Sequence, residues 1–298
     1  MATQKQIDKA YNYLDEILRL TYGENFDYSG AMYNGDFSMS LEEAQKNKHS
    51  YILKNLNFKP GNRILDVGCG WGPVLRAVRE AGGHGVGLTL STKQLAACKS
   101  GGLEVYLKDW KEADGELGTF DGISSVGSFE HYCSMEEYKA GQQDQIYDNF
   151  FKFCHERLKD GGRLYLQTMM WGRNAPEYKD ISVNAPKWSD GHIVAVLAKF
   201  YPGSWLPFGE EHIIRCAGPY FKVVSLNNGR LDYLETMKQW SRVWKFSFPK
   251  LIVALKMMAN LFTDRDFLYK LEEVWNGYQN ECFRREIIDH QRMVLEKL

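Results

Sequence analysis

A short apolar run followed by three glycines at alternate positions constrains this chain more than any other feature. Residues 64–72 read Ile-Leu-Asp-Val-Gly-Cys-Gly-Trp-Gly. Glycines between a strand and a helix let the backbone turn tightly and approach a ligand closely, and the N-terminus of the helix offers unpaired N–H groups. The segment therefore predicts a nucleotide-binding turn. Its candidate ligand contacts are Asp66, Gly68, Gly70 and Gly72.

Short β-rich runs alternate with helical stretches on both sides of this turn. The expected strands are residues 63–67, 85–89, 103–108, 122–126 and 163–169. The helices expected between them include residues 73–81, 92–100 and 146–158. This alternation predicts a parallel sheet covered by helices on both faces. Upstream, Ser40 and Glu43 form a capping-box pattern that opens a helix to about residue 56, and apolar spacing predicts another helix over residues 7–18.

The last third of the chain is rich in aromatic residues. Residues 188–278 hold 17 aromatic side chains, whereas residues 59–127 hold 4. We expect most of these rings to fill a helical core against the sheet, and a few to line an apolar pocket above the nucleotide. The predicted organisation is an N-terminal helical cover (1–57) and a nucleotide-binding domain (58–298). That domain carries an inserted lid at about 171–215 and a C-terminal helical cover at about 241–285.

Composition excludes several classes of function. The formal net charge is −1 and no block of Lys or Arg occurs, so the chain lacks the charge pattern of a nucleic-acid-binding protein. Six cysteines without a C-x-x-C pair argue against a disulfide framework or a zinc site, and for a reducing compartment. No metal site is predicted.

The same composition bears on localisation. The first residues lack the apolar core of a signal peptide, and the apolar stretch 251–262 is too short to span a bilayer. We expect a soluble, cytoplasmic protein with at most peripheral membrane contact, through residues 246–262. The sequence leaves its oligomeric state open.

The glycine spacing discriminates between nucleotides. A dinucleotide fold requires G-x-G-x-x-G and a P-loop requires Gly-Lys-Ser/Thr, and the turn has neither pattern. Its D-x-G-x-G-x-G form resembles motif I of class I S-adenosylmethionine (SAM) methyltransferases, in which the loop wraps the amino-acid end of SAM. The resemblance implies an α/β, Rossmann-like fold with a seven-stranded sheet, and SAM as the cofactor.

Further segments resemble the cyclopropane fatty acid synthase and mycolic acid methyltransferase group. Where most SAM enzymes end the second strand with an acid, this chain has the neutral side chains Thr89 and Gln94, which can hydrogen-bond the ribose instead. Other matching segments are residues 28–33, 109–110, 125–131 and 201–207, so the resemblance extends from about residue 25 onward. Besides the turn, it implies these cofactor contacts: Tyr28, Ser29, Thr89, Leu90, Gln94, Asp109, Trp110 and Val126.

Members of this group transfer a methyl group from SAM to an alkene carbon, and a bound bicarbonate takes a proton from the resulting cation. The resemblance implies that Glu130 and Tyr233 are catalytic. The cysteine of the bicarbonate site is replaced by Gly30, its histidine by Gln167 and its isoleucine by Met169. A buried anion that loses a thiol and an imidazole is short of donors. The sequence therefore argues against bicarbonate, and against ring closure with it.

The leading interpretation is a SAM-dependent methyltransferase acting through a carbocation on carbon of a hydrophobic, alkene-bearing lipid or natural product. Glu130 would accept a proton or stabilise the cation, and Tyr233 would orient it. The candidate substrate contacts are Gly30, Gln167, Met169 and Trp205. N-methylation of a small hydrophobic amine, a non-catalytic SAM-family binding protein and a dehydrogenase stay open. His131 is expected to pack internally, and Glu210 and Glu211 to be solvated.

Overall fold

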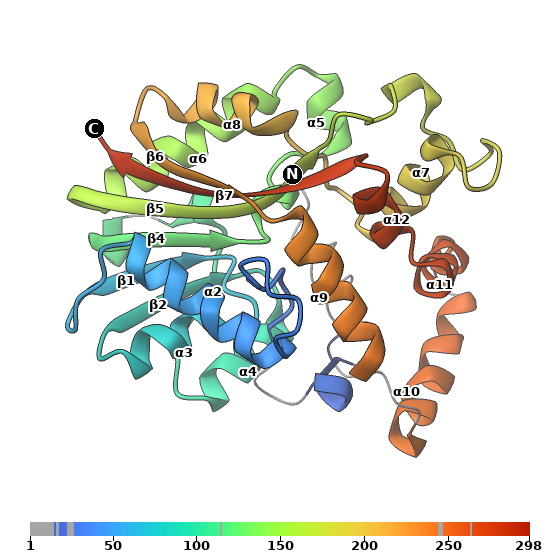
Figure 1. Ribbon diagram of the computed structural model, residues 1–298, viewed down its shortest axis with the longest axis horizontal. Coiled ribbons are helices and arrows are strands. Elements are labelled where there is room, and N and C mark those ends of the chain that lie inside the picture. The colour runs from blue at the N-terminus through green and yellow to red at the C-terminus, as the bar shows by residue number, and fades with distance from the viewer. Residues whose placement is uncertain (1–14, 16–17, 23–26, 114, 244–246, 263) are drawn as a thin grey trace.

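One mixed sheet of seven strands forms the centre of the molecule (Figure 1). The computed structural model describes residues 15, 18–22, 27–113, 115–243, 247–262 and 264–298. Its strands are β1 (Arg63–Val67), β2 (His84–Thr89), β3 (Glu104–Leu107), β4 (Phe120–Val126), β5 (Leu158–Trp171), β6 (Phe221–Asn228) and β7 (Ile288–Lys297). They lie in the order β3-β2-β1-β4-β5-β7-β6. The predicted α/β class and seven-stranded sheet are confirmed.

Strands β1 to β5 are parallel to one another, and all five overlap the segments in which the alternating pattern predicts strands. The sheet as a whole is mixed, because β7 is antiparallel to both β5 and β6. The helices between β6 and β7 stay at one end of the sheet (Figure 1). The chain therefore re-enters from that end and runs back, as antiparallel neighbours do.

Helices cover both faces of the sheet. On one face lie α2 (Leu41–Asn55), α3 (Pro73–Glu80) and α4 (Thr92–Ser100). On the other lie α5 (Met135–Lys139), α6 (Gln143–Arg157) and α8 (Gly209–Ala217). Successive β5 side chains alternate between the two layers: Leu164 and Leu166 join the core beneath α6 and α8, whereas Tyr165 packs with Ile52 of α2. The capping box at Ser40 and Glu43 is present, and α6 ends one residue before Leu158, which begins β5.

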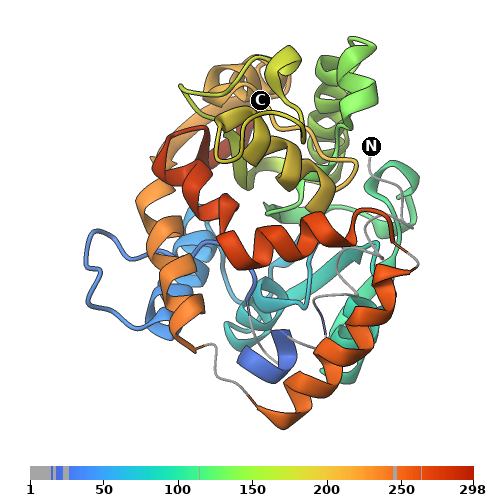
Figure 2. The same cartoon turned by 90° about the vertical axis from the view of Figure 1, so that its right-hand side faces the viewer.

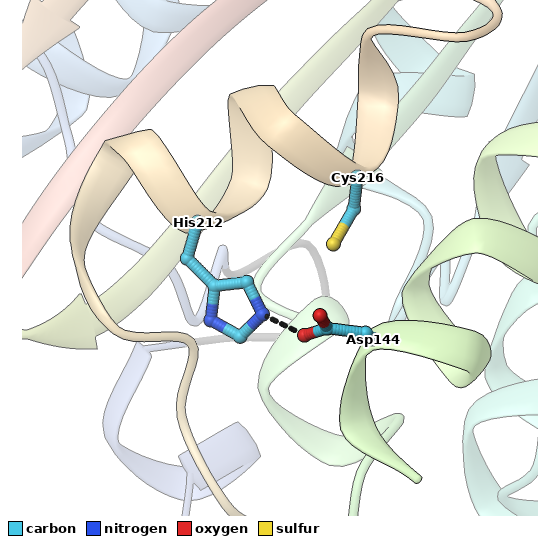
Figure 3. Close-up of side chains that lie close together, drawn as sticks. All are labelled: Asp144, His212 and Cys216. Atoms are coloured by element: carbon cyan, nitrogen blue, oxygen red, sulfur yellow. Dashed lines mark hydrogen bonds and ion pairs between the residues drawn. The ribbon is translucent and has the colours of Figure 1, made fainter.

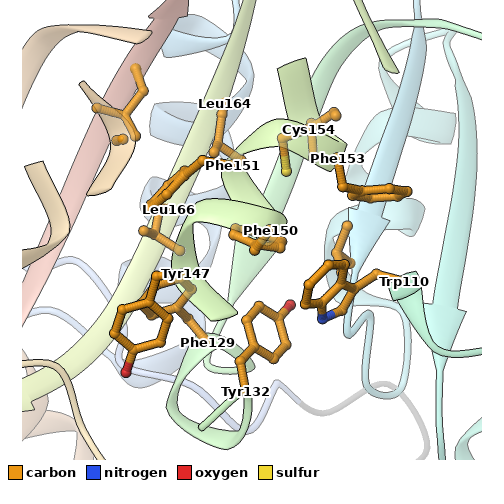
Figure 4. Packing of buried hydrophobic residues seen from close by; sticks show 14 of the residues in the cluster. Trp110, Phe129, Tyr132, Tyr147, Phe150, Phe151, Phe153, Cys154, Leu164 and Leu166 are labelled. Atoms are coloured by element: carbon orange, nitrogen blue, oxygen red, sulfur yellow. The ribbon is translucent and has the colours of Figure 1, made fainter. Parts of the chain in front are cut away.

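An aromatic core fixes the short helix η3 (Phe129–His131) directly after β4 (Figure 4). The fully buried Phe129 ring stacks on Tyr147 with centroids 4.4 Å apart, and it meets Tyr132 edge-on at 5.4 Å. Phe150 contacts the same ring at 5.5 Å. Because Phe129 is anchored in the core, its neighbour Glu130 is held in one place at the end of the sheet.

A further group of helices lies beyond the end of the sheet at which β1 to β5 finish, and Figure 2 views the molecule from that side. It comprises α7 (Asp190–Phe200), α9 (Arg230–Val243), α10 (Phe248–Met258), α11 (Phe267–Asn276) and α12 (Tyr278–Arg284). Helix α7 packs on α11 and α12, and α9 packs on α12 and β7. Short 3-10 helices complete the chain: η1 (Trp110–Glu112), η2 (Gly115–Leu117), η4 (Tyr178–Asp180) and η5 (Ala259–Leu261).

Part of the predicted lid belongs to the layer of helices on the sheet, whereas the predicted C-terminal cover lies among the helices beyond the end of the sheet. Residues 171–215 contain η4 and α7 but also the start of α8, which contacts α6, β5 and β6 and so belongs to the sheet layer. The C-terminal cover contains α10 to α12. The helix expected over residues 7–18 lies largely outside the described residues. So does residue 246, the first residue of the segment 246–262 that is predicted to contact a membrane. Across the described ranges, no helix has the length and apolar character needed to cross a membrane.

Candidate active site

Two adjoining cavities open at the end of the sheet where β1 to β5 finish. They are similar in size, and both are partly open to solvent. Tyr28, Ser29, Gly127 and His131 line both cavities. Two ligands bound side by side would therefore meet at these four residues.

The first cavity brings together eleven of the twelve predicted cofactor contacts. They are Tyr28, Ser29, Asp66, Gly68, Gly70, Thr89, Leu90, Gln94, Asp109, Trp110 and Val126. Gly72 is not among its lining residues; it caps α3 with φ 78°, and a Cβ there would lie 2.5 Å from Leu103. Asp27, Lys108, Ser128 and Tyr132 also line the cavity. Each lies within a few residues of a recognised motif, and this adjacency is the signal that could have identified them.

The glycine turn has the conformation that the sequence predicts. Gly68 and Gly70 have φ values of 78° and 54°, which side-chain-bearing residues rarely adopt. A Cβ on Gly68 would lie 2.3 Å from Cβ of Ser128, whereas the space beside Gly70 is open. The N–H groups of Gly68 and Cys69 both donate to the carbonyl of Leu88 at 2.9 Å. The turn is thus fixed to β2, and Gly68 is required by its close packing.

The polar groups of the first cavity suit a nucleoside. Thr89 Oγ1 donates to Gln94 Oε1 at 2.7 Å, which leaves the Gln94 amide N–H groups for a ligand. Asp66 accepts from Ser124 at 2.8 Å, and burial raises the pKa of its carboxyl to about 7. The buried Trp110 Nε1 has no partner among the described residues, so it too is an available donor.

The charges that line this cavity disfavour a polyphosphate. Its acidic lining residues are Asp27, Asp66 and Asp109, against one lysine, Lys108. Lys48 neutralises Asp27 and burial leaves Asp66 partly protonated at neutral pH, so the lining carries little net charge and offers a phosphate few cations. A cavity short of cations disfavours an anionic ligand. These residues therefore fit the sulfonium nucleoside SAM better than a dinucleotide.

A buried ion pair fixes residues 27–33, the segment of the site that precedes α2. Lys48 of α2 is completely buried, and its Nζ donates to Asp27 Oδ2 at 2.5 Å and to Ser29 Oγ at 2.6 Å. Burial would raise the pKa of Asp27, but the Lys48 and His49 side chains outweigh it and hold that pKa below its usual range. The segment is thereby attached to α2.

A second buried ion pair holds the other end of this segment. Arg292 of β7 donates to Asp232 Oδ2 at 2.8 Å and to the carbonyl of Ala31 at 2.7 Å. The N–H of Ala31 in turn donates to Thr236 Oγ1 at 3.0 Å. Residues 27–33 are therefore held between α2 on one side and α9 and β7 on the other.

Glu130 is the principal charged group of the second cavity. Its Oε1 accepts the backbone N–H of Met169 at 2.7 Å, while the buried Oε2 has no partner among the described residues. Burial raises the pKa of Glu130 to about 7, although the Met169 hydrogen bond opposes the shift. The carboxyl group is therefore poised to exchange a proton, or to balance a positive charge, near neutral pH.

Tyr233 enters the same cavity from α9. Its ring stacks on Phe283 with centroids 4.7 Å apart and meets His290 edge-on at 5.0 Å. Its face also covers Gly30. The ring is thus held by packing on three sides.

The four predicted substrate contacts, Gly30, Gln167, Met169 and Trp205, all line the second cavity. Gln167 is held within the protein, because its Oε1 accepts from Tyr165 at 2.9 Å and one of its two Nε2 hydrogens is donated to the Gly30 carbonyl at 3.0 Å. Only one amide N–H is left to take the place of the histidine of the resembled bicarbonate site. The other lining residues are mostly apolar or aromatic. They include Trp171, Val194, Leu197, Ala198 and Ile288, which the sequence analysis did not identify.

Two expectations about surrounding residues are corrected by the structure. His131 does more than pack: it lines both cavities and bonds Ser204 Oγ at 2.6 Å, and burial lowers its pKa to about 4. Glu210 is half-buried and accepts from Gln291 at 2.5 Å, whereas Glu211 is exposed as expected. Both differences arise from partners more than 70 residues away in the chain.

One further cluster, Asp144, His212 and Cys216, lies where α6 meets α8 (Figure 3). His212 Nδ1 accepts the N–H of Phe208 at 3.1 Å, so Nε2 carries the proton that it donates to Asp144 at 2.7 Å. A metal would need that nitrogen's lone pair, and burial raises the pKa of the Cys216 thiol to about 11. The cluster is therefore a hydrogen-bonded tie between two helices.

Comparisons with known proteins agree with this geometry. The family profile described as mycolic acid cyclopropane synthetase matches residues 1–288. Cyclopropane mycolic acid synthase 2 of Mycobacterium leprae is 31% identical over 250 residues, covering 79% of this chain and 78% of that protein. The cyclopropane synthase MmaA2 of Mycobacterium tuberculosis is similar in structure, with a TM-score of 0.76 and 23% identity over 99% of this chain and 98% of its own.

A solved structure that is similar to this chain also contains ligands. It is mycolic acid cyclopropane synthase CmaA1 complexed with SAH and CTAB, with a TM-score of 0.74 and 27% identity. The similarity covers 99% of this chain and 98% of that one.

Proposed function

The chain belongs to the mycolic acid cyclopropane synthetase family of SAM-dependent methyltransferases, and from this premise we propose that it methylates a carbon atom of a hydrophobic, alkene-bearing substrate. The substrate class is a fatty-acyl lipid or a natural product with a similar apolar body. The methylated cation then loses a proton without the help of bicarbonate.

The first cavity would hold the methyl donor. SAM supplies a methyl group on a sulfonium, which is already activated for transfer. The glycine turn would hold its amino-acid end, Thr89 and Gln94 its ribose, and Asp109 and Trp110 its base. The protein's remaining task is to align donor and acceptor and to exclude water.

The second cavity supports an apolar acceptor that becomes positively charged. Its walls are mainly aliphatic and aromatic, and its main anionic group, Glu130, has one unpartnered oxygen. A carboxylate in a dry cavity stabilises a nearby cation far more than it would in water. This unpartnered oxygen, in a cavity that shares four lining residues with the first, is the observation that carries the proposal.

The residues around Gly30 argue against bicarbonate. Gly30 offers no thiol, the Gln167 amide is already bonded to Tyr165 and to Gly30 itself, and the Tyr233 ring covers the position. An anion placed there would lack the donors that offset its desolvation. Proton removal is therefore assigned to protein side chains.

Turnover with a labelled methyl group tests the proposed function. The chain is incubated with SAM carrying a CD3 group and, separately, with dioleoyl phosphatidylglycerol vesicles, an oleoyl thioester, geranyl diphosphate or tetrahydroisoquinoline. Mass spectrometry then locates the label, with Glu130→Gln as the matched inactive control. Label on carbon of an alkene-bearing compound supports the proposal. Label only on the amine nitrogen, or turnover unchanged in Glu130→Gln, contradicts it.

A further inference from the structure

We propose that His290, at the start of β7, accepts the proton that the methylated substrate loses in the second cavity. This inference rests on the proposed function, because it assigns one step of that reaction. It concerns a residue that none of the recognised sequence motifs contains.

The position of His290 places it beside the reacting groups. It lines the second cavity and is 2% exposed. Across the β5–β7 ladder it is the register partner of Met169, the residue whose N–H bonds Glu130. The Tyr233 ring lies against it. His290 and Glu130 therefore flank the same short stretch of β5 from two directions.

The ring of His290 has an unused lone pair. The enclosed Nδ1 lies against Gly229, where a Cβ would come within 2.4 Å of it, and among the described residues no other group bonds the ring. The Gly229 backbone favours a proton on the ring, which places that proton on Nδ1. Nε2 is then the nitrogen that can accept a proton or a hydrogen bond.

The charge state of His290 suits a cavity in which a cation forms. Burial lowers the pKa of His290 well below its usual range, and the positive charges of Arg292 and Lys48 add to this effect. The ring is thus neutral before the reaction and does not repel an incoming cation. Because a C–H bond next to a carbocation is strongly acidic, a weak base suffices to remove its proton.

The step balances without an oxidant or a reductant. When the alkene π pair forms the bond to the methyl group, the adjacent carbon becomes positive and the sulfonium becomes a neutral thioether. A C–H bond beside that carbon then breaks, its electron pair forms the new double bond, and the proton moves to His290 Nε2. The imidazolium passes its proton to water when the product leaves.

A first experiment needs no substrate. With SAH bound, 1-octanol serves as an apolar probe that ends in an O–H donor, and nitrogen-15 NMR follows the histidine rings. Octanol should shift the Nε2 resonance of His290, and His290→Phe should weaken octanol binding about five-fold, the loss of one hydrogen bond. His192→Phe is the matched control, because His192 is also 2% exposed with an unpartnered Nδ1 but does not line the cavity. No shift of His290, or equal octanol affinity in His290→Phe, overturns the inference.

A second experiment measures the fate of the cation, with the acceptor found in the labelled-methyl assay. In His290→Gln, the ratio of water-captured alcohol to deprotonated product should rise by at least about ten-fold, because a positioned general base contributes about 100- to 10,000-fold, whereas His192→Gln should keep the parental ratio. An unchanged ratio in His290→Gln overturns the inference while methylation of carbon stands. Absence of carbon methylation in the parental chain rejects the proposed function, and the octanol experiment still decides whether Nε2 accepts a hydrogen bond from a ligand in the second cavity.

Discussion

A Cβ atom on Gly30 would lie 2.5 Å from Cδ2 of Tyr233 and 3.3 Å from its Cγ. The tyrosine ring thus occupies the space in which a side chain at position 30 would begin. The position of the Tyr233 ring therefore depends on the glycine that replaces the resembled group's cysteine. A thiol cannot be restored here without moving the ring.

Gly30→Cys should consequently impair the chain instead of returning a bicarbonate site. The added Cβ must displace the Tyr233 ring, and overpacking of this kind costs about 1–3 kcal/mol of unfolding free energy. Urea denaturation and SAM turnover measure the two effects. Gly30→Ala adds the same Cβ without the thiol and should lose as much; a cysteine variant clearly more active than the alanine variant would contradict this explanation.

The two glycines of the turn should respond differently to alanine. Gly68→Ala meets Ser128 at 2.3 Å and should abolish measurable SAH binding, whereas the space beside Gly70 is open. In Gly70→Ala the added Cβ meets nothing, but alanine must adopt a left-handed backbone conformation, which costs about 1–2 kcal/mol. We expect this cost to weaken SAH binding roughly ten-fold. Isothermal titration calorimetry compares them, and equal losses would show that close packing against Ser128 is not what the turn requires.

Methyl transfer should increase with pH around neutrality. The pKa of Glu130 in the folded chain is raised to about 7 by burial, so the carboxylate is scarce at pH 6 and predominant at pH 8. If the ionised form stabilises the cation, the single-turnover rate rises across this interval with a midpoint near pH 7. Glu130→Gln should be slow and lose this rise. A Glu130→Gln profile with the same midpoint would assign the titration to another group.

The raised pKa of Glu130 should also make the free energy of unfolding depend on pH. Because the folded-state pKa of Glu130 lies above its unfolded value, the folded chain binds this proton more tightly, and the associated stability is lost as pH rises through about 7. Replacing Glu130 by Gln removes the buried charge. The difference in unfolding free energy between Glu130→Gln and the parental chain should therefore shift in favour of the variant from pH 5 to pH 8, as measured by urea denaturation.

The buried Arg292–Asp232 pair should matter far more than an exposed one. Its side chains are 0% and 11% exposed, and removing one partner of a buried pair costs about 3–5 kcal/mol. Arg292→Leu should therefore lower the free energy of unfolding by that amount and weaken SAH binding through the released segment 27–33. Arg215→Leu is the control, since Arg215 and Asp144 are 62% and 54% exposed and such pairs contribute at most about 1 kcal/mol.

The parts of the fold that the sequence predicted are those with local signals. Strands β1 to β5 and helices α2 to α4 follow from apolar periodicity, the capping box and the glycine turn. Strands β6 and β7 were missed, because β7 owes its place to pairing with β5 across more than 100 residues, which no local pattern records. The mixed character of the sheet was unpredictable for the same reason.

The site divides in a similar way. The first cavity is built from motif residues at strand ends, and almost all of its predicted contacts lie there. The second cavity depends on side chains from α7, α9, α12 and β7, which only tertiary packing brings together. The contact between Gly30 and Tyr233, and the orientation of His290, have no signature in the spacing of the sequence.

The central claim is that a sulfonium nucleoside in the first cavity meets an apolar acceptor in the second. A crystal structure of the chain with SAH tests it most directly. We predict that the ribose hydroxyls contact Thr89 and Gln94, and that the sulfur lies at the boundary formed by Tyr28, Ser29, Gly127 and His131. Density that places the nucleoside outside the glycine turn, or its sulfur away from the second cavity, would contradict the account.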